Sequence, residues 1–195
     1  PYLDYPLNQI GGIHLNTIEF MSDMHPIRTK SEAEDYIKRA DLIKDVYEGV
    51  LKDLEKQADS GIFPPEFVYE HVIGQLNKFI EYSHEEHPLY TQFMKKVYEL
   101  DITEDEVNNF NNEIKRAIDE SVTPGFELLM QFMIRTEKNA NKNHGIWSQP
   151  NGDEYYKLRI RTYTTTDYSP EDIHQMGLDE VERISNRMRE ILTDL

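Results

Sequence analysis

The stretch from Ser31 to Leu54, SEAEDYIKRADLIKDVYEGVLKDL, indicates the fold more clearly than any other part of this 195-residue sequence. Ser31 and Glu34 form an S-x-x-E capping box, in which hydroxyl and carboxylate each bond the other residue's backbone amide at a helix start. Apolar residues then recur every three or four positions and fall on one helix face. They are Ile37, Ala40, Ile43, Tyr47, Val50 and Leu54. The stretch predicts a long amphipathic helix, and Gly61 is suited to end it in the left-handed conformation.

Several further helix starts are marked by prolines or capping residues. Proline is tolerated in the first turn of a helix, and Ser or Thr followed three residues later by an acidic residue caps one. These signals stand at Pro64–Pro65, Pro88, Thr103–Glu106, Pro124 and Ser169–Asp172. We expect the helix after Pro65 to run antiparallel to the first. The helix after Pro124 is apolar on most sides and should be the most buried.

The whole chain is predicted to be all-α, a bundle of about six or seven helices in one domain. Residues 1–30 lack a helical period and are expected to form an irregular N-terminal segment. Residues 31–140 hold most of the helices, residues 141–168 a Trp/Pro/Gly loop with a short helix, and residues 169–195 the last helix. Because the first residue is not methionine, we expect an excised or N-terminal part of a larger protein.

Charge and composition exclude several functions. The chain has 21 Lys and Arg against 37 Asp and Glu, a net charge of −16, which repels nucleic-acid phosphates and anionic membrane surfaces. It has no cysteine, which removes thiolate metal ligands, disulfides and cysteine nucleophiles. No apolar run reaches the length of a membrane span or of a signal-peptide core. We therefore expect no nucleic-acid partner and no membrane span.

One short motif is similar to a zinc site but has the wrong spacing. In His84-Glu85-Glu86-His87 the histidines are three residues apart, whereas H-E-x-x-H places them four apart so that both imidazoles reach one metal. We interpret this tetrapeptide as a solvated helix end. The other histidines lack metal-ligand spacing, and no phosphate-binding loop, dinucleotide fingerprint or nucleophile elbow occurs. The sequence therefore offers no catalytic residue and no metal ligand.

Two segments carry residues that a loop does not need for solubility alone. In the first, Asn8 to Gly12, the paired glycines allow positive φ or close backbone approach, and the neighbouring amides can hold a turn or bind a peptide backbone. Its candidate cleft-lining residues are Gln9, Gly11 and Gly12. A structural role and a binding role explain these residues equally well.

The second segment runs from Trp147 to Asp167. Pro150-Asn151-Gly152 predicts a turn with Asn151 or Gly152 in the left-handed conformation, and the two acidic residues that follow should open a short helix. The only tryptophan, Trp147, is expected to bury its ring in the gap between helices. The threonines before Asp167 either cap a helix end or line a polar cleft beside Arg161. The candidate cleft-lining residues here are Trp147, Tyr155, Arg161, Thr164, Thr165 and Thr166.

The order of several sequence blocks resembles one bacterial family. The blocks are YPLNQIGGIHL, MSDMHPI, SEAEDYI, DSGIFPPEFV, HPLYTQF and, the most specific, GIWSQPNGDEYYKLRIRTYTTTDYSPEDIHQMGLDEVERI. From Tyr5 to its end, the chain resembles the family of domain of unknown function 885. Members of that family look like gluzincin-type zinc metallopeptidases with a mostly helical fold, and they are often exported or lipid-anchored in the cell envelope.

The resemblance implies a function for a larger protein. The family's H-E-x-x-P-G-H-H element, where zinc lowers the pKa of a bound water and glutamate acts as general base, lies downstream of the last block and does not occur in this sequence. Zinc is therefore expected only in the full-length protein. The implied role is a helical, non-zinc half that lines one wall of the substrate cleft and is inactive alone. Its partners would be the rest of its own polypeptide and a peptide substrate. The alternative is an acidic helical binding or scaffold module for a protein or peptide.

Overall fold

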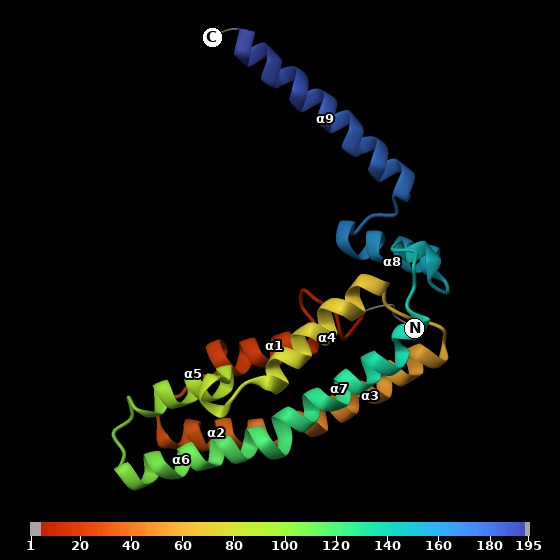
Figure 1. The fold of residues 1–195 in the computed structure, drawn as a ribbon. Coiled ribbons are helices and arrows are strands. Elements are labelled where there is room, and N and C mark those ends of the chain that lie inside the picture. The colour runs from red at the N-terminus through yellow and green to blue at the C-terminus, as the bar shows by residue number, and fades with distance from the viewer. Residues whose placement is uncertain (1–4, 194–195) are drawn as a thin grey trace. The chain divides into compact units, whose positions relative to one another are not determined.

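The computed structural model describes residues 5–193 and is all-α, as the sequence predicts (Figure 1). The first four residues of the predicted N-terminal segment and the last two of the predicted final helix lie outside the described residues. By its contacts the described chain divides into two compact units. We call residues 5–144 the helical body and residues 145–193 the C-terminal unit, and we describe each by itself.

The helical body consists of helices joined by short connections. Its α-helices are α1 (Ile13–Glu19), α2 (Lys30–Asp41), α3 (Ile43–Asp59), α4 (Glu66–Glu81), α5 (Pro88–Val97), α6 (Glu104–Ala117) and α7 (Thr123–Thr136). Short π- and 3-10 helices lie at Phe20–Met24, His84–Glu86, Ile118–Val122 and Glu137–Asn139. Most predicted signals are confirmed: Thr103 and Glu106 form a reciprocal capping box, and Gly61, at φ 74°, follows the end of α3.

The start of α2 lies earlier than predicted. Its N-cap is Thr29, whose hydroxyl accepts a hydrogen bond from the Glu32 amide at 3.2 Å, while the Glu32 carboxylate accepts one from the Arg28 amide at 2.6 Å. The S-x-x-E box at Ser31 is therefore wrong by two residues. Ala33, Tyr36 and Ile37 lie on the buried face of this helix.

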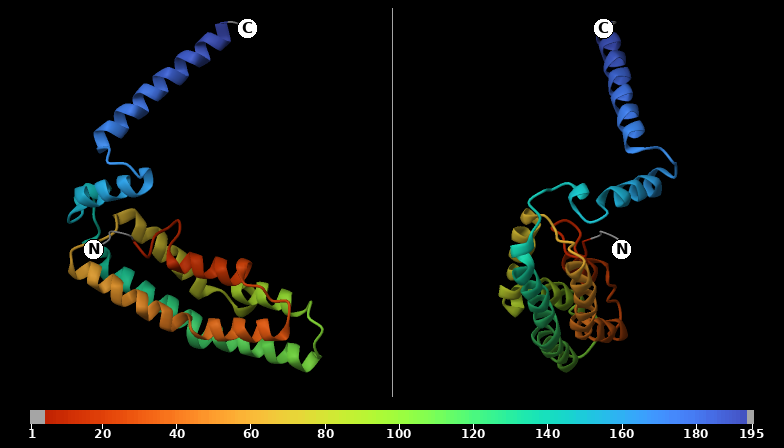
Figure 2. Two further views of the ribbon diagram at one scale, coloured as in Figure 1. Left: turned by 180° about the vertical axis from the view of Figure 1, so that it is seen from behind. Right: turned by 90° about the vertical axis from the view of Figure 1, so that its right-hand side faces the viewer.

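The long helix predicted from Ser31 is interrupted at Leu42, which separates α2 from α3. The interruption is held by a side chain distant in sequence. Ser121, in the π-turn between α6 and α7, donates to the Asp41 carbonyl at 2.9 Å and accepts from the Lys44 amide at 3.1 Å. Pro124 explains the π-turn, because proline has no amide hydrogen and its ring disturbs the preceding turn. The pairs α2–α3 and α6–α7 therefore bend at a shared point and run side by side (Figures 1 and 2).

The centre of the body is α7, as the apolar run after Pro124 predicts. It packs against both α3 and α4, so α4 rests mainly on α7 rather than on the first predicted helix. A Cβ added to Gly125 would lie 3.0 Å from the Tyr47 ring and 3.3 Å from the Lys44 Cα, which shows how closely α7 approaches α3. The largest fully buried side chains include Tyr36, Tyr47, Tyr69, Phe93, Phe126 and Leu129.

Residues 1–30 contain more helix than predicted, since α1 and the π-helix Phe20–Met24 lie within them. The buried side chains His14, Ile18 and Met21 have helical spacing, but the first is polar and the segment is too short for a clear period. Lys96 of α5 donates to the carbonyls of Ser22 and His25 at 2.9 and 3.0 Å. This lysine satisfies backbone groups left without partners where the π-helix ends.

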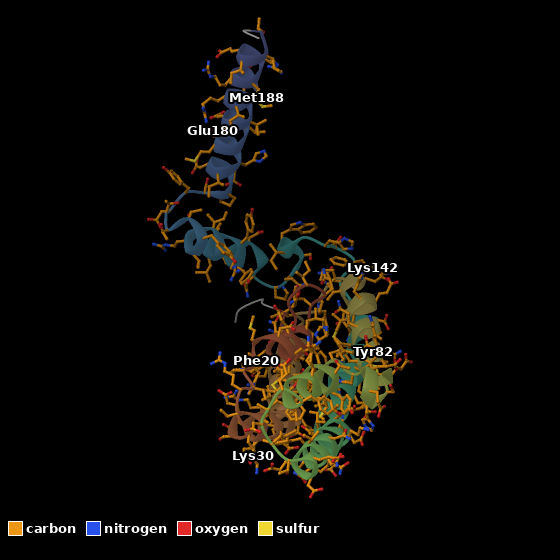
Figure 3. The ribbon with its side chains drawn as sticks, turned by 90° about the vertical axis from the view of Figure 1, so that its left-hand side faces the viewer. Phe20, Lys30, Tyr82, Lys142, Glu180 and Met188 are labelled. Carbon is orange, nitrogen blue, oxygen red and sulfur yellow. The ribbon has the colours of Figure 1, made fainter. Side chains whose placement is uncertain are left out.

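The C-terminal unit contains a 3-10 turn at Ile146–Ser148, α8 (Gly152–Thr164) and α9 (Pro170–Thr193). The capping signal at Ser169 is confirmed, because its hydroxyl accepts from the Asp172 amide and its amide donates to the Asp172 carboxylate, both at 3.0 Å. Among residues 145–193, only Gln149 and Gly152 are buried. The side chains of α9, labelled at Glu180 and Met188, project outward from the helix, and none of the residues Pro170–Thr193 is buried (Figure 3).

Candidate functional site

The loop from Asn8 to Gly12 is held by the side chain of its first residue. The Asn8 side-chain oxygen accepts from the Ile10 and Gly11 amides at 3.0 and 2.8 Å, and its NH₂ group donates to the Tyr5 carbonyl at 3.0 Å. A Cβ on Gly12 would lie 2.6 Å from the Asn8 carbonyl oxygen, whereas one on Gly11 would meet nothing within 4 Å. Close backbone approach is thus confirmed at Gly12. Gly11 is exposed, and its negative φ does not require glycine.

A buried histidine ties this loop to α4. His14 Nε2 is 2.9 Å from Gln75 Oε1, and the Gln75 NH₂ group donates to the Gln9 carbonyl at 3.1 Å. Because the glutamine oxygen is an acceptor, His14 donates from Nε2, which both the neutral ring with its proton on Nε2 and the charged ring can do. Burial lowers its pKa, which favours the neutral form. Only the backbone of Gln9 is used in this network, and its side chain is half-buried.

Trp147 is not the buried plug that the sequence predicts, since its side chain is 65% exposed. The loop around it is nevertheless tightly defined. A Cβ on Gly145 would lie 2.0 Å from the indole Nε1, and one on Gly152 would lie 1.9 Å from the Ile146 carbonyl oxygen. Asn151 takes the left-handed conformation at φ 58°, as predicted, immediately before α8. The loop therefore holds the Trp147 ring in a defined but exposed position, because the residues of this unit do not form the gap between helices that the sequence predicts.

The exposed ring lines a hollow in the C-terminal unit. Its volume is about 590 Å³, and it is formed by Ile146, Trp147, Asp153, Tyr156, Lys157, Pro170 and Glu171. Tyr156 faces it from α8, whereas the predicted residue Tyr155 is half-buried on the same helix and is not among its lining residues. Two aromatic side chains, a lysine and two carboxylates can bind a flexible chain that has both apolar and charged groups.

The three threonines after Tyr163 end α8 in a strained conformation. Thr165 has φ 56°, and the left-handed region is disfavoured for a β-branched residue. Its amide donates to the Arg161 carbonyl at 2.9 Å, and the hydroxyls of Thr164 and Thr166 lie 2.8 Å apart. These bonds confirm the predicted cap. Arg161 pairs with Asp167 at 2.9 Å, and both side chains are strongly exposed, at 70% and 82%.

The candidate residues thus form two groups in different units of the chain. Gln9, Gly11 and Gly12 belong to the helical body, and Trp147, Tyr155, Arg161 and Thr164–Thr166 to the C-terminal unit. Within the second group, the structure brings Arg161, the threonines and Asp167 together at one helix end. The sequence analysis did not select Tyr156 and Lys157 as candidates, although their nearness to the Pro-Asn-Gly turn was a usable signal.

Residues of the His84–His87 motif make structural contacts, although the buried His87 Nε2 has no hydrogen-bond partner among the described residues. His84 Nε2 pairs with Asp119 at 2.7 Å, Glu85 pairs with Lys115 at 2.7 Å, and the Leu89 amide donates to His87 Nδ1 at 3.2 Å. The glutamates are solvated, as interpreted, but His87 is buried, and desolvation lowers its pKa to about 4. Among the described residues, no group of three or more His, Asp or Glu is placed to hold a metal ion.

A second hollow lies in the helical body, between α2 and α6. Its volume is about 480 Å³. Ile37 and Phe110 form an apolar floor, and Lys30 pairs across the two helices with Glu106 at 2.7 Å. Its carboxylates are those of Glu34, Asp41, Asp105, Glu106 and Glu113. Lys30 and the capping bonds to Thr103 lower the pKa of Glu106 to about 2, so this rim is charged at neutral pH.

Comparison with known proteins places the chain in a family. The family described as bacterial protein of unknown function, DUF885, has a model that matches residues 2–195. The chain belongs to the DUF885 family. A crystal structure of a Colwellia psychrerythraea protein, described as a "putative lipoprotein", is similar to this DUF885 chain with a TM-score of 0.90 and 30% identity. The match covers 96% of this chain and 32% of that chain, so the present sequence spans about a third of its relative. A search of curated proteins found no match.

None of the helices described in residues 5–193 combines the length and the apolar character that crossing a bilayer requires.

Proposed function

We propose that this DUF885 chain is the helical, non-zinc portion of a zinc-dependent peptidase, lines one wall of its substrate cleft and is inactive alone. The peptidase activity comes from the family resemblance, and zinc would be bound by residues outside this chain. The described residues do not offer a suitable ligand group for the metal. What this chain's own residues can do is bind and orient a peptide.

The observation that carries a binding role is the strained end of α8. A left-handed β-branched residue costs about 1–3 kcal/mol, and such strain is concentrated at ligand-binding sites. Thr165 keeps this conformation although glycine would remove the strain. Beside it, the exposed Arg161–Asp167 pair contributes little stability. A guanidinium has five N–H donors, so Arg161 can also bind a peptide carbonyl or terminal carboxylate, with the threonine hydroxyls beside it.

We further propose that the protein acts in the cell envelope. The support is the similarity to a protein described as a lipoprotein, together with the resemblance to a family whose members are often exported. Fractionation of cells that produce the full-length protein tests this proposal, which predicts enrichment in the envelope fraction. Recovery in the cytosolic fraction would count against it.

The peptidase proposal is tested in a full-length DUF885 protein that carries this segment. Peptide hydrolysis should be abolished by a zinc chelator and restored by added zinc. Arg161→Ala and Gln9→Ala should lower turnover at least tenfold while changing the unfolding midpoint little. Arg135→Ala, which removes an exposed ion pair with Glu55 in the helical body, is the matched control and should leave turnover unchanged. Hydrolysis that is insensitive to the chelator would refute the proposal.

The hollow between α2 and α6 favours a second candidate function, binding of a basic peptide. Its rim is acidic, its floor is apolar and the chain carries a net charge of −16. A labelled peptide of alternating lysine and leucine should bind this chain, with affinity that falls steeply as salt rises. Glu34→Gln with Glu113→Gln should weaken binding, whereas Glu70→Gln on α4 should not. Absence of binding at low salt would exclude this function.

A further inference from the structure

The apolar residues of α9 form a continuous face that the chain leaves uncovered. None of the residues Pro170–Thr193 is buried. The large apolar side chains exposed along the helix are Met176, Leu178, Val181, Ile184, Met188, Ile191 and Leu192. Exposed apolar patches of this extent mark interaction surfaces. We call these residues, together with the half-buried Ile173, the α9 face.

The width of the α9 face distinguishes between possible partners. At about 100° per residue, the positions from Met176 to Leu192 cover roughly 200° of the helix circumference. A two-stranded coiled coil uses a narrower seam of a and d positions, whereas a wide stripe is typical of a helix packed on a globular core. Gly177 lies near the middle of the α9 face, where it offers no side chain to a partner helix. The face therefore fits a broad protein surface better than the same helix of a second copy.

Charge argues against two other partners. The sequence of α9 contains six carboxylates and three arginines. Arg183 forms an ion pair with Glu180, and Arg187 forms one with Glu190. Helices that lie on membranes carry lysine and arginine on the polar face, because bacterial and other anionic lipids attract them. The chain as a whole has a net charge of −16, so two copies repel each other. A lipid surface and a second copy are both disfavoured.

The similar structure shows that much more polypeptide is available to cover the face. About two thirds of the Colwellia psychrerythraea chain lies outside the match. Because the match covers 96% of the present chain, it includes most of α9. We propose that the α9 face is the docking surface through which this segment joins the part of the DUF885 fold that corresponds to that unmatched polypeptide. This inference rests on the proposed function, because it specifies how the non-zinc portion is attached to the rest of the peptidase.

Amide hydrogen exchange of α9 tests the inference without any substrate. In this chain alone, the amides of α9 should exchange at least tenfold faster than those of α7, because none of the residues Pro170–Thr193 is buried. Addition of the Colwellia psychrerythraea protein produced without its matched third should slow exchange across α9 at least tenfold. Where that polypeptide is insoluble by itself, co-expression with this chain should bring both into one soluble complex.

Two substitutions on opposite sides of α9 separate docking from general damage. Ile184→Asp places a carboxylate in the middle of the α9 face and should reduce complex formation at least tenfold. Asn186→Asp introduces the same side chain two residues away on the polar side, where it can still accept from Arg189, and should leave complex formation within about twofold. Equal effects of the two substitutions would overturn the proposal.

Other outcomes also decide the matter. Protection of α9 in this chain alone, with a discrete dimer in sedimentation, would assign the face to a second copy. Protection on adding phosphatidylglycerol vesicles would assign it to lipid. Wild-type chain that neither gains protection nor forms a complex would refute docking. A complex that protects α9 but hydrolyses no peptide refutes the peptidase function and leaves docking intact, whereas an active full-length protein that tolerates Ile184→Asp refutes docking alone.

Discussion

The helices α7 and α9 both carry large apolar side chains, but these side chains lie in opposite environments. In the helical body, Phe126, Leu129 and Met133 of α7 are buried between α3 and α4. In the C-terminal unit, the large apolar residues of α9 remain exposed. An amphipathic pattern therefore establishes that a helix has an apolar face, but it does not say whether the same chain supplies the surface that covers it. Four predictions test this difference, from the largest expected effect to the smallest.

Removing a ring from the centre of α7 should have the largest effect. Phe126 stacks on Phe79 with ring centroids 5.3 Å apart and contacts Tyr47 at 5.6 Å. Phe126→Ala should lower the free energy of unfolding of the body by about 3–5 kcal/mol, because it leaves a cavity in the core. Met188→Ala on α9 should change it by less than about 0.5 kcal/mol. Urea titrations followed by circular dichroism measure the free energy of unfolding of both variants. Similar losses of stability in the two variants would contradict the difference between α7 and α9.

Acid should destabilise the helical body through His87. Burial and the nearby charge of His84 lower its pKa in the folded state from 6.5 to about 4. The unfolded chain therefore binds the extra proton first, so stability from this group is complete above pH 6.5 and is lost as the pH falls toward 4. The loss should be about 2–3 kcal/mol. Urea midpoints between pH 7 and 4 measure it, and His87→Asn, which retains a capping oxygen, should remove this part of the pH dependence.

The close approach of α7 to α3 predicts opposite effects for two glycines. Gly125→Ala should destabilise the body by about 1–3 kcal/mol, because the added Cβ meets the Tyr47 ring and the α3 backbone at Lys44. Gly74→Ala on α4, where a Cβ meets nothing within 4 Å, should stabilise it by about 0.5–1 kcal/mol. Thermal unfolding of both variants checks the signs. A stabilised Gly125→Ala variant would show that the helices can move apart.

The smallest expected effect is in the C-terminal unit. Thr165→Gly should relieve strain and so raise the free energy of local opening in the last turn of α8 by about 1 kcal/mol, which slows amide exchange there. The same substitution should lower peptide turnover in the full-length protein, if the strained cap serves binding. Thr162→Gly, inside α8, is the control and should speed exchange instead. Faster exchange in Thr165→Gly would mean that the threonine bonds stabilise the cap by more than the strain costs.

Local signals in the sequence predicted local structure well. The Thr103 and Ser169 boxes, the left-handed Asn151 and the buried helix after Pro124 depend on neighbours within a few residues, so the sequence contains all the necessary information. The break at Leu42 depends on Ser121, about eighty positions away, and could not be read from the stretch that contains it. At α2 two capping patterns overlap, Thr29–Glu32 and Ser31–Glu34, and the structure uses the earlier one.

The candidate site was less predictable for the same physical reason. The sequence predicts that Trp147 buries its ring in the gap between helices, but burial requires a surface that residues 145–193 do not provide. The strain at Thr165 could not be anticipated, since three threonines in sequence have no preference for left-handed backbone. The prediction of close backbone approach is correct for Gly12. At Gly11, which was chosen with it, a larger side chain would meet no steric obstacle.

The π-turn at Ile118–Val122 also behaves as a one-residue insertion in the helical repeat. A π-turn holds one residue more than an α-turn, which shifts the phase of all later side chains by about 100°. The buried stripe of α6, through Phe110 and Ile114, is therefore out of phase with that of α7, through Phe126 and Leu129. Deleting one residue from this turn would restore a single register and rotate one of the two stripes out of the core. Alignments of DUF885 sequences should accordingly treat this turn as a position where gaps carry a structural cost.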